Sequence, residues 1–249
     1  MSTQVPSPDV AEQLPPEERA VVVRTMFGDI AGKYDATNTV LSGGMHHLWR
    51  KRALKVMDPK PDAKLLDVCC GTGDLAFTMA GALGPQGEVV GTDFTPQMID
   101  LANGKAAEAT VPGKLSFSVA DAMNLPFEDD VFDGATVSFG IRNVVDPTAG
   151  LSEMRRVVKP GGKVLVLEFG QPAGLFGMTF RWYSRWVMPA VGGLMTGNRA
   201  AYEYLPRTSA NFPAGDAFVE THLVPAGLRP VNSIPLLWGL AWLYVGEVA

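Results

Sequence analysis

The sequence has little cysteine, few histidines and no excess of positive charge, and each shortage excludes a class of protein. Only two cysteines occur in 249 residues, adjacent at Cys69 and Cys70, so they form no disulfide framework and match no zinc-ligand spacing. Two of the three histidines are adjacent as well, and no metal-ligand spacing results, so we expect no metal site. The net charge of -5 argues against a nucleic-acid partner, because proteins that bind nucleic acids usually carry a basic surface.

Long apolar runs are also missing. No stretch approaches the length of a transmembrane helix, and the first 20 residues are polar, contain proline and lack the apolar core of a signal peptide. We therefore expect a mobile tail over residues 1–20 and a single domain over residues 21–249, long enough for a large core. Together with the scarcity of cysteine, these absences indicate a reducing, cytoplasmic setting.

The most informative stretch that the sequence does contain is residues 64–93, where the pattern predicts a strand, a glycine turn, a helix and a second strand. Leu65 and Leu66 begin an apolar run typical of a buried parallel strand. Gly71 and Gly73 allow a sharp turn and let a ligand approach the backbone. Asp93 ends the second strand, at the sheet edge where ligands bind in open α/β folds.

Two cofactors compete for this unit. Gly71-x-Gly73-x-x-Ala76 satisfies the dinucleotide fingerprint, and Asp93 lies at the distance expected of a ribose-binding acid, which indicates NAD. The same layout binds S-adenosylmethionine. Asp67, inside the first strand, favours S-adenosylmethionine, because a carboxylate repels phosphates but attracts an amino or sulfonium group.

Strands and helices continue to alternate after this unit. The pattern predicts five more strands, at residues 115–119, 134–138, 163–168, 229–236 and 240–246. It predicts helices between them at residues 95–108, 146–158 and 213–226. This spacing is typical of an α/β fold with a mostly parallel seven-stranded sheet, helices on both faces and an antiparallel hairpin at the C-terminal end.

Polar residues follow several of these strands on the edge that holds Gly71. An adenosine cofactor can lie across them, since Asp93 can accept both ribose hydroxyls as charge-assisted hydrogen bonds. Asp121 can accept from the adenine amino group, and the Ala122 amide can donate to a ring nitrogen. Ser138 borders the methyl-donor end.

Residues 21–60 precede the sheet and are expected to form an N-terminal helical cap, with helices near 24–34 and 45–57. Residues 34–49 between them gather aromatic and polar side chains around a glycine pair. This composition suits a lid over a substrate pocket, although a plain structural cap is the alternative.

Residues 171–212 interrupt the alternation with an apolar insertion that we expect to lie near the substrate. Its first half is rich in aromatic residues and methionine, with Arg181 and Arg185 among them. Such a segment can hold an isoprenoid tail or touch a membrane surface. The alternative is a helical segment that packs on the sheet or on a second subunit of a homodimer.

Four blocks carry a resemblance to a known family. They are YDATNTVLSGGMHHLW at 34–49, LDVCCGTGD at 66–74, SFGIRNV at 138–144 and RVVKPGGKVLVLEFG at 156–170. With them the chain resembles the Rossmann-like class I S-adenosylmethionine-dependent methyltransferases and, more narrowly, the ubiquinone/menaquinone biosynthesis C-methyltransferase family (UbiE/MenG). Thr37, Cys69, Cys70 and Gly170 depart from the usual pattern of that family.

The resemblance implies S-adenosylmethionine as cofactor, with contacts at Thr72, Asp93, Asp121, Ala122 and Ser138. It also implies methylation of a ring carbon on a prenylated quinol, with demethylmenaquinol the preferred acceptor. We expect the protein in the cytoplasm, with peripheral contact at the inner face of the membrane where such a substrate resides. The alternatives are a benzoquinol of the ubiquinone pathway or another small aromatic or lipid acceptor, an NAD-dependent oxidoreductase, and an inactive partner protein that binds the cofactor.

Arg142 and Asn143 follow the fourth strand and are our candidates for handling the quinol oxygen. Arginine is a poor free base because its pKa exceeds about 12, so a water held by Arg142, or stabilisation of a phenolate by its charge, is the preferred role. The alternative is a structural ion pair between Arg142 and either Glu168 or Asp146.

Overall fold

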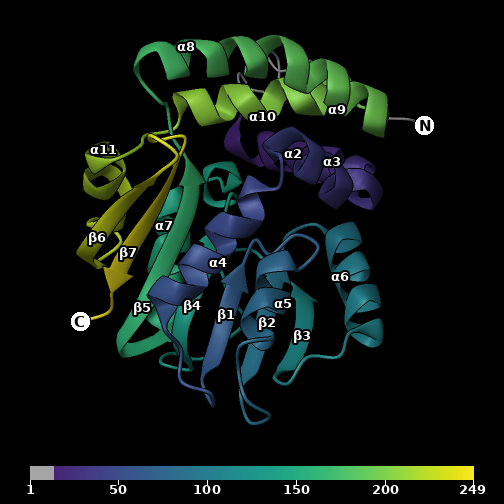
Figure 1. Cartoon of the computed structure of the whole chain (residues 1–249). Helices are drawn as coiled ribbons and strands as arrows, with labels where there is room; N and C mark the ends of the chain where they lie inside the picture. Colours follow the sequence, from purple (N-terminus) through teal and green to yellow (C-terminus); the bar gives the residue numbers. More distant parts are fainter. Residues whose placement is uncertain (1–13) are drawn as a thin grey trace.

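A seven-stranded sheet with the order β3-β2-β1-β4-β5-β7-β6 runs through the centre of the computed structural model, which describes residues 14–249 (Figure 1). The strands are β1 (Lys64–Val68), β2 (Glu88–Asp93), β3 (Lys114–Val119), β4 (Phe132–Ser138), β5 (Val158–Phe169), β6 (Arg229–Leu236) and β7 (Ala241–Glu247). Strand β7 runs antiparallel to both of its neighbours, and the other pairs are parallel. The predicted sheet and its C-terminal hairpin are therefore confirmed.

The glycine turn after β1 forms as its sequence predicts. Gly71 and Gly73 have φ values of +57° and +89°, a region that side chains with a Cβ rarely adopt. A Cβ on Gly73 would also lie 2.6 Å from the Phe117 ring. The helix α5 (Asp74–Ala80) begins directly afterwards, which leaves the turn at the carboxyl ends of β1 and β2.

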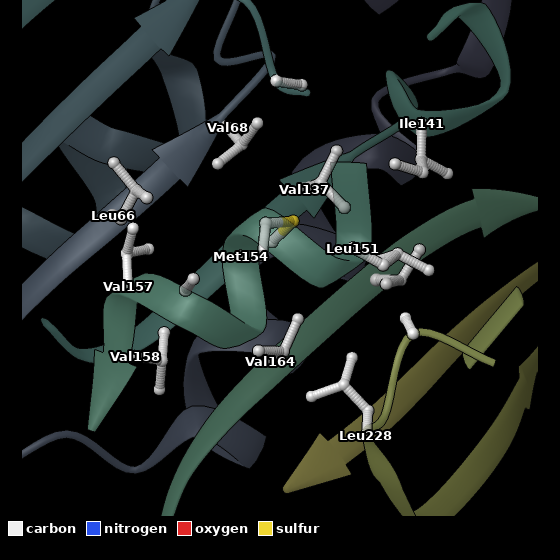
Figure 2. Packing of buried hydrophobic residues seen from close by; sticks show 14 of the residues in the cluster. Leu66, Val68, Val137, Ile141, Leu151, Met154, Val157, Val158, Val164 and Leu228 are labelled. Carbon is white, nitrogen blue, oxygen red and sulfur yellow. The ribbon is translucent and has the colours of Figure 1, made fainter. Parts of the chain in front are cut away.

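Alternate side chains of the strands build one core on each face of the sheet. On one face, Leu66 and Val68 pack with α7 (Pro147–Val157). Figure 2 shows Leu151 and Met154 of this helix among the apolar side chains of the sheet. On the other face, Leu65 packs with α4 (Met45–Met57), α5 and α6 (Pro96–Glu108). Burying a large aliphatic side chain stabilises the fold by roughly 1.5–3 kcal/mol, so these two cores hold the strand ends in place.

A helical cap lies beyond the carboxyl ends of the parallel strands (Figure 1). Its elements are α2 (Pro16–Ile30), η1 (Ala31–Lys33), α3 (Tyr34–Ser42), α8 (Gly174–Trp182), η3 (Tyr183–Val187), α9 (Met188–Thr196) and α10 (Arg199–Asn211). A third apolar cluster joins Met26 and Ile30 of α2 to Ala201 and Tyr202 of α10. The N-terminal segment and the later insertion thus form one layer over the sheet edge.

Helices α4 (Met45–Met57) and α6 (Pro96–Glu108) agree with the sequence prediction. Helix α2 begins at Pro16, so residues 16–20 are helical rather than part of a tail, while residues 1–13 of the expected tail lie outside the described residues. Within the described part, no helix combines the length and apolarity needed to cross a bilayer.

Two other elements differ from their predicted bounds. The helix expected at 213–226 is reduced to α11 (Asp216–Phe218) and the π-helix η4 (Val219–Leu223), because Gly215 takes a φ of +63° and donates its N–H to the Tyr244 hydroxyl at 2.7 Å. Strand β5 begins at Val158, five residues early, since Val158 already pairs with Phe132 of β4.

Candidate functional site

Two cavities meet above the carboxyl ends of β1, β2 and β4. The first, which we call the edge cavity, has a volume of about 450 Å³ and lies between the glycine turn, the ends of β2 and β4, and α2. The second, the cap cavity, has a volume of about 340 Å³ and lies between α3, α4, η3 and α10. Tyr34, Ser138 and Phe139 line both cavities and so form their common wall.

Asp93 is the buried carboxylate of the edge cavity. Its Oδ2 accepts the N–H of Gly71 at 2.9 Å, and its Oδ1 accepts the N–H of Thr95 at 2.8 Å. Burial raises the pKa of Asp93, and these two hydrogen bonds oppose the rise. The carboxylate therefore fixes the glycine turn and at the same time faces the cavity.

The other residues predicted to bind a cofactor at this edge also come together. Gly71, Asp121, Ala122 and Ser138 all line the edge cavity. Asp121 is held by its own loop, since its Oδ1 accepts the N–H of Met123 at 2.9 Å. Residues from three strand ends thus share one cavity, as the strand order requires.

Two buried polar atoms in this cavity have no hydrogen-bond partner among the described residues. They are Oγ of Ser138 and Oδ1 of Asn143. Leaving a buried polar atom unpaired costs roughly 1–3 kcal/mol, so both atoms are positioned for a polar ligand. Together with the carboxylates of Asp93 and Asp121, they fit a ligand that carries hydroxyl groups and positive charge, which S-adenosylmethionine does.

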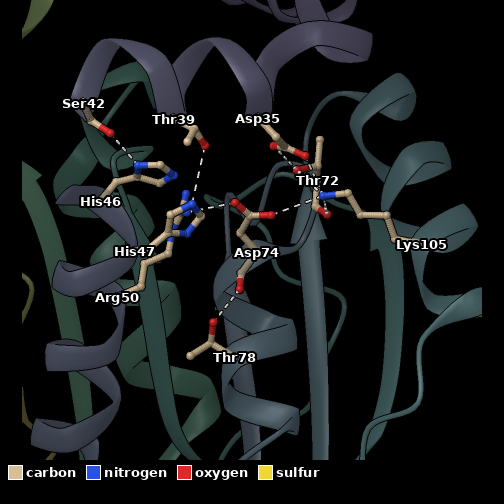
Figure 3. Close-up of polar contacts among 10 residues, drawn as sticks. All are labelled: Asp35, Thr39, Ser42, His46, His47, Arg50, Thr72, Asp74, Thr78 and Lys105. Atoms are coloured by element: carbon tan, nitrogen blue, oxygen red, sulfur yellow. Dashed lines mark hydrogen bonds and ion pairs between the residues drawn. The ribbon is translucent and has the colours of Figure 1, made fainter. Parts of the chain in front are cut away.

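Thr72 occupies a different position from the other predicted residues. It is 3% exposed and is not among the residues that line either cavity. Its Oγ1 donates to Oδ1 of Asp35 at 2.6 Å, and Lys105 donates to Asp35 at 2.6 Å and to Asp74 at 3.2 Å (Figure 3). The Thr72 side chain therefore ties the glycine turn to α3, and its contact with a cofactor stays a prediction.

Asp67 also lies outside the lining of both cavities. Its Oδ1 accepts from the Thr136 hydroxyl at 2.8 Å, between β1 and β4, and burial raises its pKa to about 7 while this hydrogen bond lowers it. The attraction of Asp67 to a cationic cofactor stays a prediction, and the carboxylates that line the edge cavity itself include those of Asp93 and Asp121.

Arg142 lies on the short helix η2 (Ile141–Asn143) and lines the cap cavity. Its Nη1 donates to Oε1 of Glu168 at 2.6 Å and to the carbonyl oxygen of Phe139 at 2.7 Å. The two charged side chains are only 4% and 1% exposed. The structural pairing with Glu168 is confirmed, whereas Asp146 instead caps α7 by accepting the N–H of Thr148.

The two predicted catalytic residues are adjacent in the loop after β4, but they line different cavities. Arg142 lines the cap cavity, and Asn143 lines the edge cavity. In the common wall, the Phe139 ring lies 4.4 Å from that of Phe169, centroid to centroid. Phe139 was not predicted as a site residue, since its backbone φ of +58° and its place in the wall arise from the fold.

Tyr34 is the hydroxyl-bearing member of the wall that comes from the cap. Burial raises its pKa, while a hydrogen bond with Asn38 lowers it, so the phenol is protonated at neutral pH. The sequence indicated a lid in this region but not which of its side chains would reach the sheet edge.

The fold brings His46, His47 and Asp74 together, although the sequence spacing indicated no such cluster. One potential ligand atom from each lies within 4.8 Å of the others (Figure 3). However, Asp74 already accepts from Arg50 at 2.9 Å and from Lys105 at 3.2 Å. Burial, with the charge of Arg50, lowers the pKa of His46 to about 4. We interpret this cluster as a structural network that joins the cap to α5.

The cap cavity is lined mainly by apolar and aromatic side chains. They include Leu41, Met45, Trp49, Phe169, Phe180, Met188, Leu205, Leu237 and Leu240. Residues 171–212 supply several of them, so the insertion lies at this cavity, and its place near a substrate stays a prediction. The lining suits a largely apolar ligand. Three arginines also line the cavity, and one of them, Arg142, donates to the backbone of Phe139 in the common wall.

Comparison with known proteins identifies relatives over nearly the whole chain. The ubiE/COQ5 methyltransferase family matches residues 14–247. The ubiquinone/menaquinone biosynthesis C-methyltransferase UbiE of Bdellovibrio bacteriovorus is 43% identical over 228 residues, which cover 91% of this chain and 96% of that protein. The demethylmenaquinone methyltransferase of Bacillus cereus is 41% identical over 231 residues, which cover 92% of this chain and 95% of that protein.

Solved structures share the fold at lower identity. A SAM-dependent methyltransferase from Thermotoga maritima, described as a possible histamine N-methyltransferase, has a TM-score of 0.62 at 17% identity, covering 90% of this chain and 99% of that one. A SAM-dependent methyltransferase from Aquifex aeolicus has a TM-score of 0.56 at 17% identity, covering 80% and 89%. These likenesses establish the methyltransferase fold.

Proposed function

The chain belongs to the ubiE/COQ5 methyltransferase family and is an S-adenosylmethionine-dependent methyltransferase, and we propose that its acceptor is the ring of a prenylated quinol, demethylmenaquinol, which it converts to menaquinol. The observation that carries this proposal is the common wall of the two cavities. The cavity that contains the carboxylates of Asp93 and Asp121 and the largely apolar cap cavity share Tyr34, Ser138 and Phe139, so a charged donor and an apolar acceptor can be neighbours.

The edge cavity is the proposed cofactor site. Asp93 would accept from the ribose hydroxyls, Asp121 and the Ala122 amide would hold the adenine, and Gly71 would let the backbone approach. Ser138 would face the methyl-donor end, and Thr72 would act through the turn that it anchors. When bound there, the cofactor supplies an electrophilic methyl group.

Arg142 and Asn143 are the proposed catalytic residues. Loss of a hydroxyl proton leaves a phenolate, whose charge raises the electron density at the ortho carbon that receives the methyl group. Arg142 stabilises that negative oxygen, or holds the water that takes the proton, and Asn143 orients the ring from the other side of the wall. Proton transfer of this kind contributes about 10²- to 10⁴-fold to the rate.

We also propose that the protein works in the cytoplasm and meets the inner face of a membrane, where a prenylated quinol resides. The apolar lining of the cap cavity supports this proposal, because a prenyl tail that leaves a bilayer needs an apolar site. A homodimer formed through the cap is the alternative use of the same region.

Methyl transfer in solution tests the proposal. The purified protein is incubated with S-adenosylmethionine and demethylmenaquinol kept reduced under nitrogen, and the product is measured by mass spectrometry. We expect one added methyl group on the reduced ring and none on the oxidised quinone, whose ring carbon is a poor nucleophile. A benzoquinol of the ubiquinone pathway serves as the competing acceptor. Failure to methylate either quinol by a folded protein that binds the cofactor would contradict the proposal.

A further inference from the structure

One face of the helix formed by α8 and η3 is apolar and exposed. Leu175, Met178, Trp182 and Trp186 are 76%, 60%, 63% and 58% exposed. Their spacing of three, four and four residues places them on one side of the helix. We call these four residues the outer apolar face. Exposed apolar residues that share a continuous face mark an interaction site more often than isolated ones do.

The opposite side of the same helix faces the cap cavity. Phe180, Tyr183 and Met188 line that cavity, and Tyr183 donates its hydroxyl to the carbonyl oxygen of Leu41 at 2.8 Å. Packing against the cavity therefore accounts for the inner side chains only. The outer apolar face is separated from the cap cavity by the thickness of a single helix.

The charge around this face is opposite in sign to that of the whole chain. Residues 171–202 contain three arginines and no acidic residue, whereas the chain carries a net charge of -5. Arg181 and Arg185 are both exposed, although Arg181 also lines the cap cavity. The Arg185 guanidinium lies 5.6 Å from the centre of the Trp186 ring. Exposed tryptophan beside arginine is typical of side chains that bind at the headgroup level of a bilayer.

The position of the helix also suits a flat partner. Helices α8 and α9 form the outermost layer of the cap, with α10 between them and the sheet (Figure 1). Trp238, which is 75% exposed at the turn between β6 and β7, packs edge-on against Phe176 of α8 with ring centroids 5.1 Å apart. A third exposed tryptophan thus lies beside the same helix.

A second copy of the chain fits this surface less well. A two-fold dimer would bring the same surface of both subunits together, so Arg181 and Arg185 would face their own copies. The segment offers no acidic residue to pair with them. An anionic lipid surface supplies both the apolar layer and the negative charge that the exposed residues need.

We propose that the outer apolar face docks the protein onto an anionic lipid membrane, with Trp182 and Trp186 among the headgroups and Arg181 and Arg185 on lipid phosphates. Docking in this way places α8 at the bilayer surface, from which a prenyl-tailed acceptor can enter the cap cavity. The docking surface follows from exposure and charge, whereas this route for the acceptor rests on the proposed function.

Vesicle binding tests the docking surface directly. Flotation with phosphatidylglycerol vesicles is expected to recover the wild-type protein, and phosphatidylcholine vesicles are expected to recover much less. The Trp182→Ser/Trp186→Ser variant should weaken binding by roughly tenfold or more, because it removes most of the inserted apolar area. Arg185→Gln should weaken binding to the anionic vesicles about fivefold, the effect of one cation near the surface.

Matched variants control for general loss of apolar area and charge. Val224→Ser/Val231→Ser removes two side chains that are 51% and 50% exposed elsewhere, and Arg52→Gln removes a cation from the exposed side of α4. Both variants should bind vesicles like the wild type. The Trp182→Ser/Trp186→Ser variant should methylate a tail-free quinol normally, since neither residue lines a cavity, but should turn over a long-tailed quinol in vesicles more slowly.

Three results would overturn the docking surface. The first is that the wild-type protein does not bind anionic vesicles, and the second is that the Trp182→Ser/Trp186→Ser variant binds them as well as the wild type does. The third is that light scattering shows a dimer for the wild type and a monomer for this variant, while vesicle binding is the same for both. The last result would assign the face to a second copy of the chain. Vesicle binding that behaves as expected, with no quinol methylated, would refute the proposed function and leave the docking surface intact.

Discussion

Replacing Asp93 by alanine is expected to weaken the binding of S-adenosylmethionine ten- to hundredfold. A hydrogen bond to a charged group contributes about 1.5–3 kcal/mol, and each 1.4 kcal/mol changes the dissociation constant about tenfold. The same carboxylate accepts the backbone N–H groups of Gly71 and Thr95, so its loss also loosens the glycine turn that the cofactor must contact. Titration calorimetry measures the effect.

Two variants make the Asp93 result specific. Asp93→Asn keeps one acceptor oxygen and nearly the same volume. Its affinity for S-adenosylmethionine should lie between that of the wild type and that of Asp93→Ala. Asp100→Ala removes an exposed carboxylate of α6 that lines neither cavity. This variant should bind S-adenosylmethionine with the affinity of the wild type. An Asp93→Ala protein that is folded, by circular dichroism, and binds with wild-type affinity would refute the ribose role, and tight binding of NADH would favour the dinucleotide interpretation.

Removing either partner of the Arg142–Glu168 pair is expected to destabilise the fold by about 3–5 kcal/mol, because the remaining charge stays buried without its partner. The side chains are 4% and 1% exposed, and Glu168 also accepts the N–H of Phe169 at 2.8 Å, so neither charge can easily reach water. Urea unfolding of Arg142→Ala and Glu168→Ala measures the loss.

A double variant separates the structural role of this pair from its catalytic one. Arg142→Met with Glu168→Leu removes both charges and should recover much of the lost stability, since two apolar side chains can replace a buried ion pair. Turnover should stay about 10²- to 10³-fold below the wild type if Arg142 stabilises the phenolate. A stable double variant with wild-type turnover would leave Arg142 with only the structural role.

The arrangement of the edge cavity could be predicted from the sequence because of one geometric fact. The carboxyl ends of parallel strands share an edge, so Asp93, Asp121 and Ser138 had to come close once their strands were recognised. Gly71 joined them because a glycine turn directly follows the first strand. Periodicity and turn residues are local signals, and these four positions depend on little else.

Other features depend on contacts that no local pattern encodes. Thr72 turns toward Asp35 and Lys105, which are 37 and 33 residues away in the chain, so its side-chain position could not be read from the glycine motif. The common wall joins Tyr34 of the cap to Phe139 of the sheet edge. These features depend on the packing of remote segments, whereas the sequence indicated a lid and an apolar insertion without showing which of their side chains would meet the sheet edge.

The most direct test of the central claim is a crystal structure of the protein with S-adenosylhomocysteine. We predict that its ribose hydroxyls lie within hydrogen-bond distance of the Asp93 carboxylate, with the adenine against Asp121 and Ala122. Its sulfur should face the wall formed by Tyr34, Ser138 and Phe139, pointing toward the cap cavity. A ligand found in the cap cavity, or one whose ribose lies away from Asp93, would contradict the assignment of donor and acceptor to these two cavities.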